Sequence, residues 1–243
     1  MPNPFFRFKQ FTVYHHRSAM KVTTDGCLFG AWCAAELAEG KEGAGGEQTV
    51  LDIGAGTGLL SLMVAQKAAA RVDAVELDAS AAGQAEENVA ASPWKDRIAV
   101  HQGDILEFSF PHAYDCIISN PPFYEKEIES ASAGRNLAHH GHGLQLRPLL
   151  QLMGQHLLED GSFFLLLPYK RLAEIEREVK KAGLFLEKKV VVRQSVRHDP
   201  FRLLLKGGRR ETPLKSSELS IWDGQQQYTP EFVALLKDYY LYL

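Results

Sequence analysis

The stretch TVLDIGAGTGLL, residues 49–60, combines a short apolar run with three closely spaced glycines. TVLDIG has the composition of a buried strand, and GLLSLMVAQKA (58–68) has the spacing of a helix. Gly54, Gly56 and Gly58 allow a sharp turn and let a ligand approach main-chain amides. A helix that begins here directs its free N–H groups at such a ligand. We therefore predict a strand, a ligand-binding glycine turn and a helix.

The same alternation continues outward along the chain. Strands are expected at 49–54, 72–77, 98–104, 114–120, 162–168, 188–196 and 201–208. Helices are expected at 58–68, 80–92, 146–161 and 171–184, with Ser80 as an N-cap and Gly161 as a C-cap. Regular alternation of this kind indicates an α/β fold with a doubly wound, mostly parallel sheet. The last two strands form a hairpin around 197–200, which gives seven strands with an antiparallel edge pair.

Two acidic residues follow successive strands of this sheet. Ligands of open α/β sheets bind beyond the carboxyl ends of the strands. Glu76 after the second strand can accept hydrogen bonds from ribose hydroxyls, and Asp104 after the third can accept from an adenine amino group. The sequence lacks G-x-G-x-x-G, because Leu59 stands at the sixth position, and this disfavours a dinucleotide. Each acid alone fits an ordinary strand end, but together with the glycines they predict an adenosyl cofactor.

The 243 residues suffice for one large domain, and we expect a single domain over 1–243. Residues 1–46 are expected to form an N-terminal extension that contributes to the cofactor and substrate sites, and 47–243 a Rossmann-like core. No apolar run approaches the ~20 residues of a membrane helix. The N-terminus does not resemble a signal peptide, and the three cysteines have no metal-binding or disulfide spacing. These features favour a cytoplasmic protein with no membrane contact.

Charge is unevenly distributed although the net charge is only -3. Residues 1–21 contain four basic and no acidic residues, and 170–215 contain 14 basic against 6 acidic residues. Two basic segments thus flank an acidic body, which permits an anionic partner on one face. A solvated surface of mixed charge explains the same pattern equally well.

The motifs LDIGAGTG, VELD, GD and NPPF, in this order and at these intervals, resemble the class I S-adenosylmethionine-dependent methyltransferases. The segment FKQFTVYHHRSAMKVTTDGCLFGAW (8–32) is similar to the N-terminal motif of bacterial tRNA (adenine-N6)-methyltransferases. Those enzymes act on adenine 37, next to the anticodon of valine tRNA. The resemblance covers essentially the whole chain. One departure is VYHH, where a glutamine is expected near His15 or His16.

This resemblance implies the cofactor S-adenosyl-L-methionine and the partner tRNA, contacted at its anticodon stem-loop by a protein that is expected to be a monomer. The implied cofactor-binding residues are Thr24, Asp25, Asp52, Gly54, Ala55, Gly56, Gly58, Glu76, Leu77, Asp104, Ile105 and Asn120. The implied catalytic residues are Asn120, Pro121, Pro122 and Phe123. The implied substrate-binding residues are Lys21, Phe123, Tyr124 and Arg135.

The stretch DCIISNPPFYE (115–125) suits methyl transfer to an aromatic amine. Such a nitrogen becomes more tetrahedral as it attacks, and its hydrogens gain positive character. Acceptors aimed at those hydrogens stabilise the transition state more than the ground state. Asn120 supplies a side-chain oxygen and Pro121 a carbonyl, while the prolines add no competing donor. Phe123 offers a face on which an extruded base can stack.

Other functions remain open from the sequence. A protein glutamine, as in release factors, presents the same two amide hydrogens, and DNA adenine, ribosomal guanine or a small amine are further substrates. A nicotinamide dehydrogenase would share the fold and Glu76 but has no use for Asn-Pro-Pro. A non-catalytic RNA-binding module is the third class. His139, His140 and His142 lack acidic or thiol partners in the sequence, so no metal site is predicted.

Overall fold

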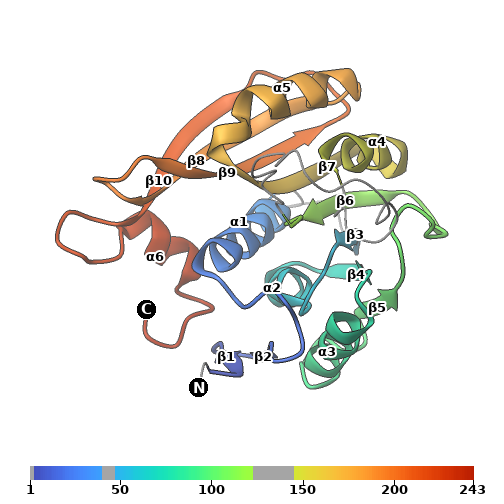
Figure 1. Ribbon diagram of the computed structural model, residues 1–243, viewed down its shortest axis with the longest axis horizontal. Coiled ribbons are helices and arrows are strands. Elements are labelled where there is room, and N and C mark those ends of the chain that lie inside the picture. Colours follow the sequence, from blue (N-terminus) through green and yellow to red (C-terminus); the bar gives the residue numbers. More distant parts are fainter. Residues whose placement is uncertain (1–2, 40–46, 123–144) are drawn as a thin grey trace, which may run out of the picture.

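The computed structural model describes residues 3–39, 47–122 and 145–243. Its main sheet has eight strands in the order β10-β8-β9-β7-β6-β3-β4-β5. These strands are β3 (Gln48–Ile53), β4 (Ala70–Glu76), β5 (Ile98–Gln102), β6 (Tyr114–Ser119), β7 (Leu157–Pro168), β8 (Phe185–Ser195), β9 (Pro200–Gly208) and β10 (Lys215–Trp222). Only β9 runs antiparallel to its neighbours. The doubly wound, mostly parallel α/β sheet is confirmed (Figure 1).

The expected number of seven strands is wrong, because β10 adds an eighth. It pairs in parallel with β8, from Lys215↔Lys188 to Trp222↔Ser195. β10 begins with exposed polar residues, and only Leu219 and Ile221 are buried in it. A strand with so few apolar residues at an edge has a weak sequence pattern. The predicted β8–β9 hairpin is confirmed, but β9 lies inside the sheet and not at its edge.

Helices cover both faces of the sheet, and side-chain alternation along the strands supplies two separate cores. In β7, Phe163 and Leu165 face one core while Phe164 and Leu166 face the other. The face of Phe164 and Leu166 carries α1 (Thr24–Glu39), α2 (Leu59–Lys67), α3 (Ala79–Ala90) and α6 (Pro230–Leu236). The face of Phe163 and Leu165 carries α4 (Leu146–His156) and α5 (Leu172–Lys181). Figure 1 shows the two groups on opposite sides of the strands.

The N-terminal segment folds into a separate two-stranded antiparallel sheet. β1 (Phe5–Arg7) pairs with β2 (Thr12–Tyr14), and we call residues 5–14 the N-terminal hairpin. Its buried face is aromatic: Phe8 stacks on Phe11, and Phe11 packs edge-on against Trp94. The hairpin is thereby attached to the core and lies beside α2 and α3 in Figure 1.

Two predicted helix ends differ from the structure. α4 ends at His156, and Gly161 is not a C-cap but a residue of β7. A Cβ at Gly161 would come within 3.0 Å of the Asp115 carbonyl oxygen, so glycine is needed there for close approach of the strands. Ser80 is not the N-cap of α3. Asp78 takes that role, because its side chain accepts from the Ala81 N–H at 2.8 Å.

Candidate functional site

The carboxyl ends of four neighbouring strands are aligned at one edge of the sheet. Ile53 at the end of β3 pairs with Ser119 at the end of β6, and the Ser119 hydroxyl donates to the Ile53 carbonyl at 2.8 Å. On the other side Ile53 pairs with Val75, and Glu76 pairs with Gln102 of β5. The strand order reverses between β3 and β6, which is the place where such sheets bind ligands. The structure therefore brings the glycine turn directly beside Asn120.

Three glycines after β3 adopt the left-handed backbone conformation that the sequence suggested. Their φ angles are 70° at Gly54, 57° at Gly56 and 77° at Gly58. A Cβ built on Gly54 or Gly56 would have no atom within 4 Å, whereas one on Gly58 would meet Ala85 at 3.5 Å. Gly58 thus lies against α3 with room for an ordinary contact, and its left-handed φ is what favours glycine there. Gly54 and Gly56 line an open cradle of main chain, which fits a bound adenosyl cofactor. We call residues 54–58 the glycine loop.

Glu76 holds the glycine loop in place. Its Oε2 accepts from the Gly56 N–H at 2.8 Å, and its Oε1 accepts from the Asp78 N–H at 2.9 Å. A carboxylate has about four lone-pair sites, so both oxygens can still accept from a ligand. Glu76 is half-buried at the strand end. Its position suits the predicted ribose contact. Glu76 also has a structural role that the sequence did not reveal, because it fixes the main chain at Gly56 and Asp78.

Other predicted cofactor residues lie along the same edge. Asp104 is exposed, and its Oδ1 accepts from the Leu106 N–H at 2.9 Å. Leu77, beside Glu76, is 63% exposed, while Ile105 is buried. Ala55 is buried in the glycine loop. The contacts of these four residues with a cofactor stay predictions.

Asp52 differs from the other acids because it is completely buried within β3. Its Oδ2 accepts from the Ser61 hydroxyl at 2.7 Å and from the Ser61 N–H at 3.2 Å. Its Oδ1 has no hydrogen-bond partner in the part of the chain that the structure describes. Burial raises the pKa of the Asp52 carboxyl to about 7, and the Glu76 charge acts in the same direction. Asp52 thus has a spare buried acceptor just before the glycine loop.

Asn120 and the two prolines follow β6. Asn120 is half-buried, Pro121 is buried and Pro122 is exposed. Asn120 lies next to the start of α1, where a Cβ on Gly26 would come within 4.0 Å of its Nδ2. Phe123, Tyr124, Arg135 and the three histidines of the HHGH cluster lie outside the described residues. The acceptor role of Asn120 is therefore compatible with its place, and the stacking role of Phe123 stays a prediction.

The N-terminal motif also reaches this edge. Thr24 and Asp25 form the first turn of α1, a helix that is absent from those expected from the sequence. The Arg202 Nε donates to Asp25 Oδ2 at 2.8 Å and links α1 to β9. Lys21 is exposed, and its Nζ donates to the His15 carbonyl at 3.1 Å. Arg202 was missed by the sequence analysis, because 177 positions separate it from Asp25.

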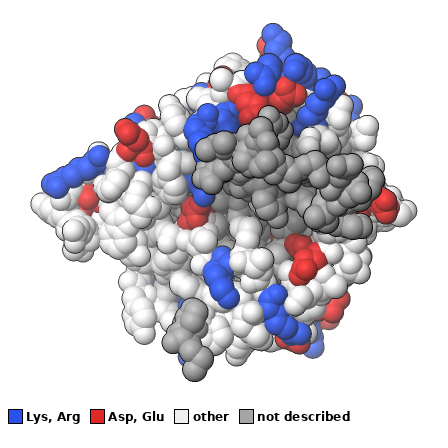
Figure 2. Space-filling model, viewed as in Figure 1, with Lys and Arg blue, Asp and Glu red and all other residues white. Residues whose placement is uncertain are grey.

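Many cations of the basic segment 170–215 form ion pairs within the fold. Glu36 of α1 accepts from Lys188 at 2.7 Å and from Lys206 at 3.4 Å. Further pairs are Arg171–Glu174, Lys181–Glu178, Lys189–Glu176, Arg193–Glu218, Arg209–Glu159 and Arg210–Asp160. On the face shown in Figure 2, basic and acidic side chains stand beside one another. The charge asymmetry of the sequence is thus partly cancelled in the folded chain.

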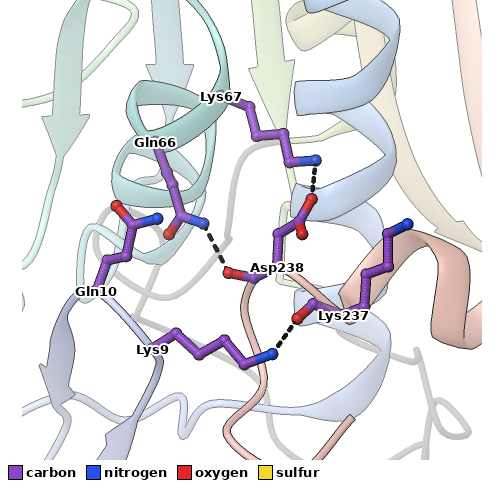
Figure 3. Close-up of a pocket in the computed structure, with 6 residues that line it drawn as sticks. All are labelled: Lys9, Gln10, Gln66, Lys67, Lys237 and Asp238. Carbon is purple, nitrogen blue, oxygen red and sulfur yellow. Dashed lines mark hydrogen bonds and ion pairs between the residues drawn. The ribbon is translucent and has the colours of Figure 1, made fainter.

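A cavity of about 420 Å³ lies away from the glycine loop, at the other end of α2. It is lined by Lys9, Gln10, Gln66, Lys67, Lys237 and Asp238 (Figure 3). The lining groups bind one another: Lys67 pairs with Asp238, and the Gln66 amide donates to the Asp238 carbonyl at 2.9 Å. We interpret this cluster as a polar contact that fastens the C-terminal segment to α2.

The described residues contain no helix with the length and apolarity of a membrane span. Among them there is also no group of three or more His, Cys, Asp or Glu side chains arranged to bind a metal.

Comparison with known proteins agrees with the geometry of this edge. The family model "Methyltransferase small domain" matches residues 37–159. A predicted O-methyltransferase from Agrobacterium tumefaciens superposes with a TM-score of 0.60 at 18% identity, covering 88% of this chain and 96% of that one. A glycopeptide N-methyltransferase in complex with S-adenosylmethionine superposes with a TM-score of 0.53 at 16% identity, covering 74% and 94%. At such low identity these two structures support the fold alone.

Closer relatives extend over the whole chain. The tRNA1(Val) (adenine(37)-N6)-methyltransferase of Phocaeicola vulgatus is 39% identical over 241 residues, which cover 99% of both chains. Other curated relatives, 37–40% identical, have the same name. This degree of identity over the full length leaves no doubt about kinship: the chain belongs to the family of the tRNA1(Val) (adenine(37)-N6)-methyltransferases.

Proposed function

We propose that this protein transfers a methyl group from S-adenosyl-L-methionine to N6 of an adenine in tRNA, adenine 37 next to the anticodon of valine tRNA. The observation that carries the proposal is the register of β3 with β6, which sets the glycine loop beside Asn120. Kinship with full-length tRNA1(Val) (adenine(37)-N6)-methyltransferases supports the choice of substrate. When bound, the cofactor supplies an electrophilic methyl group on a sulfonium.

The cofactor would be held by the open side of the glycine loop. The main chain at Gly54 and Gly56 can approach the ligand closely, since no side chain stands between. Glu76 would accept from the ribose hydroxyls, and Asp104 from the adenine amino group. Asp52 Oδ1 is a buried acceptor with no protein partner among the described residues, which suits a contact with a positively charged or hydroxyl group of the cofactor.

The chain would act on the target base through acceptors. The Asn120 oxygen and the Pro121 carbonyl would hold the two hydrogens of the adenine amino group, and so favour the tetrahedral nitrogen of the transition state. The prolines keep this geometry rigid. The proton can leave to water after methyl transfer, so a separate general base is unnecessary. Phe123 would stack on the extruded base, while Tyr124, Lys21 and Arg135 would contact the RNA.

The extension 1–46 would serve both sites. Thr24 and Asp25 begin α1 next to Asn120, and the N-terminal hairpin adjoins the glycine loop through α3. The start of α1 beside Asn120 and the link from Tyr14 through Asn88 to Thr57 support this role.

The decisive experiment uses the full-length protein, labelled cofactor and total tRNA from a strain that lacks the enzyme. We expect one labelled product, N6-methyladenosine at position 37 of valine tRNA, identified by mass spectrometry of the digested RNA. A transcript with guanine at position 37 should remain unlabelled. A release factor offered in parallel tests the glutamine alternative, and labelling of that protein instead of RNA would contradict the proposal.

A further inference from the structure

Asn88 lies in α3 with 1% of its surface exposed, and its side chain joins three parts of the chain. Its Oδ1 accepts from the Tyr14 N–H at 2.9 Å. Its Nδ2 donates to the Tyr14 carbonyl and to the Thr57 carbonyl, each at 2.9 Å. Both amide hydrogens and the oxygen are therefore satisfied. Such complete pairing is what permits a polar side chain in a buried position.

The two partners of Asn88 belong to different functional elements. Tyr14 is the last residue of β2 in the N-terminal hairpin, and Thr57 lies between Gly56 and Gly58 in the glycine loop. The hairpin and the loop are 43 positions apart in sequence (57 − 14). The Asn88 amide is a direct hydrogen-bonded bridge between them.

Three of the five residues of the glycine loop are glycines, which restrict the backbone little, so contacts with other elements must hold the loop in one conformation. Glu76 fixes it at the Gly56 N–H, and Gly58 packs against Ala85 and Val89 of α3. Asn88 fixes the peptide between these two points by binding the Thr57 carbonyl. Rotation of that peptide would alter the main chain on both sides, including the part of the loop that forms the open cradle. Asn88 therefore determines how the cradle is presented to a ligand.

We infer that Asn88 is a positioning residue that couples the N-terminal hairpin to the cofactor-binding glycine loop. The inference rests on the adenosyl cofactor of the proposed function and is independent of the RNA substrate. Coupling between two elements is reciprocal in free energy. A ligand that stabilises the glycine loop should therefore also protect the N-terminal hairpin from hydrogen exchange. Conversely, loss of the hydrogen bonds between Asn88 and the hairpin should weaken the binding of the ligand.

The first test compares the affinity of Asn88→Ala and Asn88→Asp variants for S-adenosylhomocysteine by calorimetry. Asn88→Asp retains the oxygen for the Tyr14 N–H but places a second oxygen against two carbonyls. Either variant leaves the Thr57 carbonyl without its donor and the glycine loop less firmly held, so the dissociation constant should rise about tenfold, which is about 1.4 kcal/mol. The control is Gln84→Ala, because Gln84 is an equally buried amide on α3 whose Nε2 donates to Glu87 at 3.3 Å. That variant should bind with unchanged affinity.

The second test needs no variant, so it decides the matter even if the Asn88 variants fail to fold. Hydrogen exchange at the Tyr14 N–H should slow several-fold when S-adenosylhomocysteine binds the natural protein. Unchanged exchange at Tyr14, or equal affinity of folded Asn88→Asp and natural protein, would overturn the inference. Intact cofactor binding without tRNA methylation would instead contradict only the RNA substrate. Failure of the natural protein to bind S-adenosylhomocysteine would contradict the cofactor proposal and this inference together.

Discussion

The Arg202 guanidinium on β9 donates to the Asp25 carboxylate on α1 at 2.8 Å, which joins the antiparallel strand to the helix that begins beside Asn120. Asp25 has 17% of its side chain exposed, so the pair is partly shielded from water. An acidic residue in the first turn of a helix is favourable in itself. The ion pair therefore both stabilises the start of α1 and fixes its position at the edge of the sheet.

A double-mutant cycle with Asp25→Asn and Arg202→Met should reveal this coupling. We expect an interaction free energy of about 1 kcal/mol in urea unfolding, since the pair is only partly exposed. The rate of methylation should fall by more than the decrease in the folded fraction accounts for, because the Gly26 backbone would move relative to Asn120. The pair Arg193–Glu218 is the control, as it lies on β8 and β10 and its Glu218 side chain is 65% exposed. Equal coupling energies and unchanged rates for both pairs would contradict a special role of Asp25–Arg202.

Asn120→Ala should separate catalysis from cofactor binding. Removing one acceptor that acts in the transition state should lower turnover by about 10²–10³-fold, as for loss of a comparable group in other enzymes. The affinity for S-adenosylhomocysteine should change little, because the glycine loop and Glu76 remain. Single-turnover rates and calorimetry measure the two quantities. Asn120→Asp keeps an oxygen and should retain more activity than alanine. A collapse of cofactor affinity in Asn120→Ala would show that Asn120 is structural.

Glu76 and Asp104 should differ in their importance for the cofactor. Glu76→Ala removes the predicted ribose acceptor and also the acceptor of the Gly56 N–H, so affinity for S-adenosylhomocysteine should fall by more than tenfold. Asp104→Ala should weaken affinity less, since Asp104 is exposed and, within the described part of the chain, its side chain accepts only from the Leu106 N–H of its own turn. The tRNA concentration for half-maximal rate should stay unchanged in both. Asp78→Ala, which removes only the N-cap of α3, is the control for stability. Equal affinities of both variants and the natural protein would contradict the predicted cofactor contacts.

The sequence predicted the part of the fold that depends on local pattern. Buried strands followed by glycine or acidic residues have distinctive runs, so the edge formed by Gly54, Glu76, Asp104 and Asn120 followed from residue order and parallel topology. Helix α1 (Thr24–Glu39) was not predicted, because Asp25-Gly26 at its start is also a common turn pair. Edge strand β10 was missed, because its exposed polar residues lack an apolar alternation.

Features that depend on distant partners were beyond the sequence. Nothing near Asn88 indicates that it binds both Tyr14 and Thr57, and nothing near Arg202 indicates Asp25. Gly161 has the local signature of a helix end, yet its place is set by close approach to the Asp115 carbonyl in the neighbouring strand. At Gly161, therefore, tertiary packing outweighs local propensity.

The buried Asp52 carboxyl should make stability depend on pH near neutrality. Its pKa is raised by burial from 3.8 in the unfolded chain to about 7 in the folded protein. Between these values the folded state holds a proton that the unfolded state releases. The contribution of Asp52 is therefore fully present below about pH 4 and is lost as the pH rises towards about pH 7, by up to about 1.4 kcal/mol per pH unit.

Asp52→Asn replaces the carboxyl by a neutral group of the same shape that can still accept from Ser61. The free energy of unfolding of this variant should not fall between about pH 4 and pH 7, unlike that of the natural protein. The difference in stability between the two proteins should therefore grow with pH up to about pH 7. Urea titrations at several pH values, without ligand, measure this difference. Asp238→Asn is the opposite control: Lys67 lowers the pKa of Asp238, so its contribution is present above the unfolded pKa and is lost only in acid. Parallel pH profiles of Asp52→Asn and the natural protein would show that Asp52 is ionised in the folded state throughout, and that its burial is compensated by a charge or donor not identified among its contacts.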